Sequence, residues 1–322
     1  MLNQRLFVSS HAPFYHNGAS IKGRSYNIIL ASILPVAMGV YRYGAPALAV
    51  VVFSVAWAMI WELLMNKAMK KPISIGDGNA AVIGLLFAMM MPATTPWWAV
   101  ITGTFIAVVV GKQIFGGIGC NPLNPTALAI AILMLSWKGL VNFDEALVNY
   151  NFSFYPAYPL GILKHFGVFQ SGSYTIKGLF MGMQVGGIGA SFAWCLVLGG
   201  IYLMLRGVIR WEISISFLAG IFFTALIFNL VDPSKYAGPL FHIVTGYTFI
   251  GAFYLLTEDS SSPVNFIPMI LYGALAGIMT VLIRNIGFYI DGTVLAILLL
   301  NVANPLLDKI KPKALGKGID YA

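Results

Sequence analysis

Charged side chains are scarce in this sequence. They make up 9% of the 322 residues, whereas apolar residues make up 59%. A soluble domain carries about 25% charged residues, because its surface must face water. The scarcity excludes an ordinary soluble domain, and lipid is expected to be the solvent for much of the chain. The net charge of +8 would suggest nucleic acid in a soluble protein, but these cations lie in short segments between apolar runs. We therefore expect no nucleic-acid partner.

Cysteine is equally scarce, with Cys120 and Cys195 alone in the whole sequence. Because iron–sulfur clusters are usually held by four thiolates, the chain cannot ligate an ordinary cluster by itself. The two are expected on opposite sides of the membrane, which argues against a disulfide. The sequence also shows no nucleophile–His–Asp triad, no phosphate-binding glycine loop and no group of zinc ligands, so no catalytic or metal site is expected. The segment 1–26 is polar and basic, which predicts a cytoplasmic tail and not a cleaved signal.

What the sequence has in abundance is apolar runs. A spanning helix needs about 20 mostly apolar residues, and fewer where it is broken or buried in protein. About ten runs qualify on this rule, which predicts an all-α polytopic membrane protein. The runs at 78–91 and 242–256 are short for a full crossing. The predicted spans are 27–44, 46–66, 78–91, 97–111, 122–137, 188–206, 212–231, 242–256, 266–283 and 291–306.

The distribution of Lys and Arg orients these spans, since cytoplasmic loops carry the excess. Placing both termini inside leaves few cations outside. The predicted division is a cytoplasmic tail 1–26, a first five-helix half 27–137, an external loop 138–187, a second half 188–306 and a cytoplasmic tail 307–322. The cations left in outer segments are Arg42, Lys138, Lys164, Lys177, Lys235 and Arg284.

The two halves share weak internal similarity at an offset of roughly 170 residues. Asp77-Gly78 matches Thr245-Gly246, and Lys112-Gln113 matches Arg284-Asn285. Gly18-Ala19-Ser20 also matches Gly189-Ala190-Ser191. Because each half has an odd number of spans, the second enters from the opposite side. This predicts an inverted repeat, a plan typical of transporters, whose sites lie between the repeats near short or interrupted helices.

The string Phe115 to Ala127, which reads Phe-Gly-Gly-Ile-Gly-Cys-Asn-Pro-Leu-Asn-Pro-Thr-Ala, predicts a sharply shaped loop beside the fifth span. Glycine allows close backbone approach, and the amides of Asn121 and Asn124 offer a donor and an acceptor to the edge of a heterocycle. The alternative is a re-entrant turn that caps the fifth helix, with proline near its start.

Acidic residues at the ends of spans have two interpretations as well. Charges at such depth are costly and usually functional, which allows an ion or proton pathway. Asp77 and Asp291 each begin a span, however, and helix N-caps are favoured there. Glu62 is expected to pair with Lys67 at the interface. His242 is expected to be a hydrogen-bonded structural residue, and the 14 methionines are expected to supply soft core packing.

Gly189, Ala190 and Ser191 stand at the predicted external mouth of the sixth span. A hydroxyl flanked by residues without bulk can accept a covalent group. It can equally cap the helix while the glycines allow close packing.

Four ordered segments of the chain give it a family resemblance. It resembles the RnfD/NqrB family, whose members are membrane components of the Rnf ion-translocating oxidoreductase and of its relative, the sodium-pumping NADH:quinone oxidoreductase. The run Phe115 to Gly119, with Asn121-Pro122 and Asn124-Pro125, is the most specific piece. The segments are Asp77 to Trp98, Lys112 to Pro125, His242 to Pro263 and Ile290 to Pro305.

The resemblance implies two inverted five-helix halves similar to urea transporters, in a bacterial or archaeal cytoplasmic membrane. It implies FMN attached through its phosphate to a Thr on the external side, by a flavin transferase. That position falls on Ser191, after Gly189 and Ala190, so this chain departs from the usual Thr. It also implies a second, non-covalent flavin, riboflavin or FMN, for which Asn121 and Asn124 are candidates.

The function implied is electron passage inside a complex of membrane and soluble subunits. That complex couples ferredoxin oxidation and NAD reduction to movement of Na⁺ or H⁺. The chain itself would hold no complete active site. The main rival is a passive channel or transporter for a small neutral solute, which would need a continuous pore and no cofactor. A second rival is a structural anchor for soluble redox partners.

Overall fold

A computed structural model describes residues 20–167 and 174–310, which form helices and connecting turns without a β-strand in those ranges. The first predicted half contains five helical segments in order. They are α1 (Ile21–Tyr43), α2 (Ala45–Ala68), α3 (Asn79–Met90) after a short turn η1 (Ile75–Asp77), α4 (Trp97–Phe105) continued by the π-helix η2 (Ile106–Gln113), and α5 (Pro125–Ser136).

The second predicted half follows the same order, with its third segment broken. The described residues between the halves form four short helices. These are α6 (Lys138–Val141), α7 (Phe143–Ala146), α8 (Pro159–Phe166) and α10 (Ile176–Phe180). The second half is α11 (Ala193–Leu205), α12 (Trp211–Val231), α13 (Pro239–Val244) with α14 (Thr248–Ile250) and the π-helix η3 (Gly251–Leu255), α15 (Phe266–Asn285) and α16 (Thr293–Leu307).

Four of these helices, α1, α2, α12 and α15, are long and apolar enough to cross a membrane. Five other predicted spans fall on shorter apolar helices, such as α3 and α5, and the predicted span 242–256 falls on the broken segment α13, α14 and η3. Length and burial explain the difference, because a helix enclosed by protein does not need to match the lipid thickness. From Val82 to Met90 every residue of α3 is buried.

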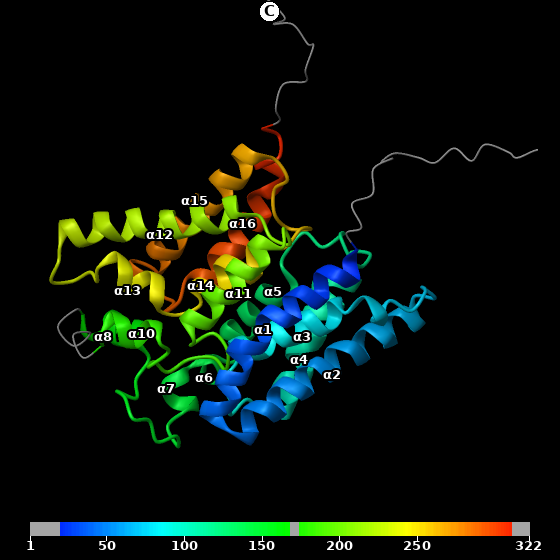
Figure 1. Ribbon diagram of the computed structural model, residues 1–322, viewed down its shortest axis with the longest axis horizontal. Helices are drawn as coiled ribbons and strands as arrows, with labels where there is room; N and C mark the ends of the chain where they lie inside the picture. The colour runs from blue at the N-terminus through cyan, green and yellow to red at the C-terminus, as the bar shows by residue number, and fades with distance from the viewer. Residues whose placement is uncertain (1–19, 168–173, 311–322) are drawn as a thin grey trace, which may run out of the picture.

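The packing gathers each half around its short third segment. In the first half, α2 packs along α3 and α4, and in the second α12 packs along α13 and α15. The halves meet where α1 contacts α11 and where α5 contacts α16. In Figure 1, α1 to α4 lie to the right, α12, α13 and α15 lie to the left, and the green helices α6, α7, α8 and α10 gather along the lower part.

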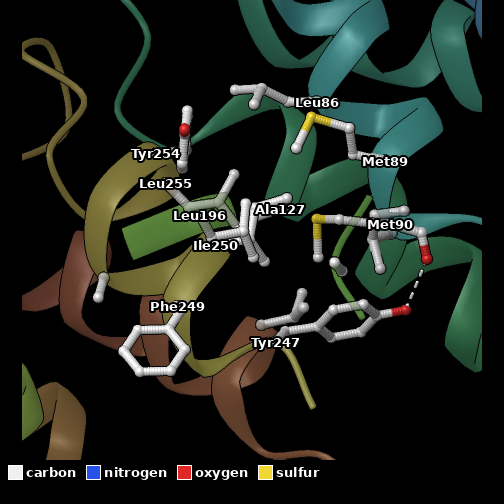
Figure 2. Close-up of a cluster of buried hydrophobic side chains, with 14 of the residues drawn as sticks. Leu86, Met89, Met90, Ala127, Leu196, Tyr247, Phe249, Ile250, Tyr254 and Leu255 are labelled. Carbon is white, nitrogen blue, oxygen red and sulfur yellow. Dashed lines mark hydrogen bonds between the residues drawn. The ribbon is translucent and has the colours of Figure 1, made fainter. Parts of the chain in front are cut away.

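The core between the halves is a set of flexible and aromatic side chains. Met89, Met90 and Met91 are fully buried, which confirms the prediction that methionine supplies soft core packing. Figure 2 shows Tyr247 reaching from the broken segment of the second half toward α3, where its hydroxyl donates to the Met90 carbonyl at 2.8 Å. One hydrogen bond thus ties the two short segments together at the centre.

Several element boundaries differ from the predictions. The helix α1 begins at Ile21, inside the predicted tail 1–26, while residues 1–19 lie outside the described part of the chain. The helix α11 begins at Ala193 and not at 188. The residues before it form a turn instead of the first turn of a helix, because their N–H groups bind carbonyls at the end of α3.

Candidate functional site

The turn before α11 caps the end of α3. The N–H of Ile188 donates to the Met91 carbonyl, and the N–H groups of Gly189 and Ala190 both donate to the Met89 carbonyl, each at 3.0 Å. The last carbonyls of a helix have no partner inside it, so they need donors from elsewhere. A Cβ on Gly187 would lie 2.6 Å from the Met89 carbonyl oxygen. Glycine at 187 is therefore required by close packing of the two halves.

Ser191 lies at the end of this turn and is 3% exposed. Its hydroxyl donates to the Gly187 carbonyl at 2.9 Å. Phe192, not Ser191, is the N-cap residue of α11, so the capping alternative for this hydroxyl was wrong. A Cβ on Gly186 would lie 2.7 Å from the Ser191 Oγ. The missing side chain at 186 leaves room directly in front of the hydroxyl.

The end of α1 brings a cation and a phenol to the same turn. The Arg42 guanidinium lies 4.1 Å from the centre of the Phe192 ring and donates to the Gly182 carbonyl at 2.5 Å. The Tyr43 hydroxyl donates to the Gly186 carbonyl at 3.3 Å. Positive charge next to a buried hydroxyl favours an anionic group there, because charge-assisted hydrogen bonds are the strong ones.

Ser191 also lines one of two cavities that share three lining residues. The first, of about 10 Å³, is lined by Ser191, Gly186, Phe143, Tyr158 and Tyr247 among others. The same three aromatic residues line a second cavity of about 370 Å³, here called the aromatic cavity. A cavity of this size, mostly apolar with a few polar groups, is typical of ligand sites.

Aromatic side chains form part of the wall of the aromatic cavity, and polar side chains also line it. The Phe143 ring lies 5.2 Å from that of Tyr158 and 6.2 Å from that of Tyr247. The remaining walls come from both halves and the segments between them. They include Met134, Lys138, Asn142, Glu145, His165, Phe288, Tyr289 and Asp291. Such a cavity suits a flat heteroaromatic ring, whose polar edge would meet these polar side chains.

A buried ion pair fixes the wall formed by the broken helix. The Arg284 Nη2 lies 3.0 Å from the Asp291 Oδ1, and both side chains are nearly inaccessible. Arg284 donates to the His242 carbonyl at 2.7 Å and to the Thr248 hydroxyl at 2.9 Å. A cation stabilises the C-terminal end of a helix, so Arg284 supplies the partner that the last turn of α13 lacks.

Asp291 accepts backbone N–H groups at the starts of two helices. Its carboxylate accepts the N–H of Tyr247 at 2.7 Å, just before α14, and the N–H of Thr293 at 3.0 Å, at the start of α16. The capping predicted for Asp291 is therefore present, together with an ion pair that was not predicted. Asp77 similarly accepts the N–H of Asn79 at 2.8 Å, at the start of α3, which confirms the interpretation of that residue as a cap.

Asn121 and Asn124 lie at the other end of the molecule, where the two halves meet. The Asn121 amide donates to Glu258 at 2.7 Å, and its oxygen accepts from Ser260 at 2.8 Å. The Asn124 amide donates to the Leu255 carbonyl at 3.0 Å, while its oxygen accepts the N–H of Ala127 at 2.9 Å. The loop therefore caps α5, as one alternative held, and also binds the second half.

Two cavities adjoin these asparagines, with volumes of about 70 and 110 Å³. Asn124 lines one and Asn121 the other. The residues that line both are Arg24, Ile28, Asn79, Val82, Pro125 and Glu258. A ligand at this end would meet amides, a carboxylate and a guanidinium between the halves.

A second buried ion pair corrects the prediction for Glu62. Its partner is Lys112 at 2.8 Å, not Lys67, and both side chains are almost fully buried. The Glu62 carboxylate also accepts from the Ser74 hydroxyl at 2.7 Å. Lys67 was chosen because it is close in sequence, but the fold brings η2 against α2 and places Lys112 there instead.

His242 also differs from its prediction. Its ring is buried, but neither ring nitrogen has a hydrogen-bond partner among the described residues. Its backbone carbonyl accepts from Arg284 at 2.7 Å and from the Thr248 hydroxyl at 2.9 Å. Within residues 20–167 and 174–310, His, Cys, Asp and Glu side chains form no group of three that could hold a metal ion.

The sequence interpretation missed most of the surroundings of Ser191. Arg42 carried a signal, because it is one of few cations in an outer segment. Tyr43, Phe143, Tyr158 and Tyr247 carried none, since aromatic residues at the membrane interface are common. Their convergence depends on segments that are far apart in the chain.

Comparison with known proteins gives full-length matches. The model of the NQR2, RnfD, RnfE family matches residues 8–316. The chain is 35% identical to the D component of the Na(+)-translocating ferredoxin:NAD(+) oxidoreductase complex of Acetobacterium woodii, over 96% of this chain and 93% of the relative. It is 31% identical to the D component of the proton-translocating ferredoxin:NAD(+) oxidoreductase complex of Clostridium ljungdahlii, over 96% and 95%. It is 29% identical to the D component of the ion-translocating oxidoreductase complex of Cronobacter sakazakii, over 94% and 97%.

Proposed function

The chain belongs to the NQR2, RnfD, RnfE family, and from this premise we propose that it is the membrane electron-carrier subunit of an Rnf-type complex. It would pass electrons through flavin between the ferredoxin and NAD sides while the complex translocates Na⁺ or H⁺. Both ions stay in the proposal because relatives at 35% and 31% identity are named for different ones. The other subunits of the complex are its expected partners.

The observation that carries this proposal is the position of Ser191. FMN would be held there as a phosphoester of the Ser191 Oγ. The hydroxyl faces a glycine without a side chain, on the turn that Arg42 contacts through Phe192 and the Gly182 carbonyl, and it lines a small cavity that shares three aromatic residues with the aromatic cavity. The residues present therefore fit the group. Bound flavin supplies an acceptor of one or two electrons, and the protein sets its potential through burial and hydrogen bonds.

Attachment should occur before the external segments close. Only 3% of Ser191 is exposed, so we expect the flavin transferase to act while the turn before α11 is still open. Arg42 would then offset the charge of the phosphate, which otherwise faces the negative end of the α1 dipole. Tyr43 would hold the turn through Gly186.

The experiment that tests this function is gel fluorescence of the purified, denatured chain, combined with mass spectrometry of the peptide that contains Ser191. The chain should be produced together with its flavin transferase. We expect a fluorescent band and a peptide whose mass is raised by FMN at Ser191. A colourless chain without that peptide would contradict the proposal and favour a passive channel.

We expect the isoalloxazine ring of the flavin to bind in the aromatic cavity. Tyrosine quenches flavin emission by electron donation, and phenylalanine does not. The variant Tyr289→Phe should therefore raise the emission of the native protein in part, because Tyr289 lines the cavity while Tyr158 and Tyr247 remain there to quench. Emission after denaturation should stay equal to that of the unmodified chain.

Tyr155→Phe is the matched control, since Tyr155 is 47% exposed and does not line the aromatic cavity. Subtracting the emission of the corresponding Ser191→Ala proteins removes the contribution of any non-covalent flavin. If Tyr289→Phe and Tyr155→Phe emit alike, the flavin ring does not lie against Tyr289, and the proposed position at this wall of the cavity is wrong.

The second, non-covalent flavin is proposed at Asn121 and Asn124. Two adjoining cavities with shared polar residues support this position. Asn121→Leu should lower the flavin released by acid while the covalent band persists, because only the non-covalent group loses hydrogen bonds. Asn149→Leu, an exposed residue in the segment between the halves, is the control. Equal release from both variants would contradict the assignment.

We also propose that the helices form two inverted five-helix halves similar to urea transporters, in about ten crossings, some of them by short or broken segments. The matching order of segments and the pairing of α1 with α11 and of α5 with α16 support it. Gly78 and Gly246, which the repeat aligns, both have positive φ, at 74° and 67°. Both termini would lie in the cytoplasm of a bacterial or archaeal cell, with the chain in its cytoplasmic membrane.

A further inference from the structure

We propose that a second external cavity binds the phosphate group of an anionic phospholipid. This cavity, here called the basic cavity, has a volume of about 250 Å³. It lies between α8, the connection from α12 to α13, and the end of α15. Its polar lining consists of Lys164, Lys235, Arg284, Asn285 and the Tyr236 side chain.

The basic cavity carries positive charge that neighbouring carboxylates balance only in part. No carboxylate is among its lining residues in the described chain. Arg284 is neutralised by Asp291, but within residues 20–167 and 174–310 the Lys164 ammonium donates to carbonyl oxygens alone, those of Tyr289 at 2.5 Å and Ile283 at 3.5 Å. Burial lowers the pKa of Lys164. An anion in the cavity would supply the missing counter-charge.

A neutral donor at the same place is also unused. The Asn285 Nδ2 is inaccessible to water and has no partner among the described residues. Leaving a buried donor unpaired is unfavourable, so this amide is available to a ligand. A phosphate oxygen in the cavity would accept from Lys164, and it would accept from this amide as well once the Asn285 side chain turns toward the cavity.

The positions of the external cations point the same way. Outer segments of membrane proteins are depleted in Lys and Arg. Of the six cations expected outside, three line this one cavity, Lys164, Lys235 and Arg284. Their convergence from three separate segments is more specific than a scattered surface charge.

The surroundings favour a lipid as the source of the phosphate. Leu160, Leu163 and Ile290 form apolar walls beside the cations. Val231 at the end of α12 is 76% exposed, and Ile286 at the end of α15 is 69% exposed. A phospholipid can place its phosphate among the cations while its acyl chains cover this exposed apolar surface, as in other basic pockets between membrane helices. A free phosphate would satisfy the cations alone.

The test compares the full-length chain in nanodiscs of phosphatidylcholine with and without phosphatidylglycerol. Unfolding temperature is measured by intrinsic fluorescence, and retained lipid by native mass spectrometry. We expect phosphatidylglycerol to raise the unfolding temperature by several degrees. The double variant Lys164→Gln, Lys235→Gln should lose that gain and the retained anionic lipid, because glutamine keeps hydrogen bonds but carries no charge.

The matched control is Lys177→Gln, an exposed lysine of the same external region that does not line the cavity, and it should keep the gain. An equal gain in the double variant and the unmodified chain would overturn the proposal, as would no gain in the latter. Inorganic phosphate is added to the phosphatidylcholine discs as a separate arm. If it alone reproduces the full gain, the anion is free phosphate and the lipid assignment is wrong.

Discussion

Replacing Ser191 by alanine is expected to remove all flavin that survives denaturation. The phosphoester needs a hydroxyl, and the two preceding residues, Gly189 and Ala190, offer none. The cost to the fold should be small. Ser191→Ala removes one donor, whose partner is the Gly187 carbonyl, and a hydrogen bond of this kind contributes about 0.5–1.5 kcal/mol. Loss of covalent flavin should therefore come without loss of folded protein.

The matched control is Ser214→Ala. Ser214 is also fully buried and its hydroxyl donates to a carbonyl, that of Ala252, at 2.8 Å. Both variants remove the same kind of hydrogen bond, but only one removes the proposed attachment atom. Gel fluorescence of the denatured chain and size-exclusion profiles of the native chain are compared. A fluorescent Ser191→Ala band as strong as that of Ser214→Ala would show that flavin is attached elsewhere.

The helices could be predicted to a large extent because apolar runs report directly on burial in lipid or protein. The short segments at 78–91 and 242–256 were found in the same way, and the structure places helices at both. The turn before α11 was not found. Its residues are as apolar as a helix, and only the position of the Met89 and Met91 carbonyls explains why they leave the helical path.

The partners of the buried charges show the limit of sequence interpretation. Glu62 was paired with Lys67 because neighbours in a helix can be inferred from spacing. Its true partner, Lys112, is brought by packing of η2 against α2. Arg284 and Asp291 are close in sequence, yet their pairing was missed because a turn, not a helix, joins them. Long-range approach and turn geometry are both set by tertiary packing.

The candidate site, too, could be predicted from the sequence only in part. Ser191 was proposed through the family resemblance, because the local string by itself allowed both attachment and helix capping. The cavity beside it is formed by residues from α7, the segment before α8, the break before α14 and the loop before α16. No local pattern connects these segments. Attachment at Ser191 therefore stays a prediction from the sequence, whereas the residues that line the cavity could not be predicted.

Neutralising Asp291 is expected to have the largest effect on stability. Asp291→Asn keeps the shape of the side chain but leaves the Arg284 guanidinium, which has a 1% exposed side chain, without its counter-charge. Breaking a buried pair from one side costs about 3–5 kcal/mol. The amide also cannot accept both the Tyr247 and the Thr293 N–H groups on equal terms, so the starts of α14 and α16 lose a cap. The wall of the aromatic cavity should loosen with them.

Asp308→Asn separates this effect from the general loss of a carboxylate. Asp308 accepts a backbone N–H, that of Val264 at 3.3 Å, but pairs with no buried cation among the described residues. Its amide variant should unfold within about 0.5 kcal/mol of the unmodified chain, as surface changes usually do. Unfolding of both variants in the same micelles is followed by tryptophan fluorescence. Similar transitions would mean that Asp291 contributes little net stability. A large gap would show that the break between α13 and α14 depends on this ion pair, and that the aromatic cavity and the basic cavity are held in shape by charge as well as by packing.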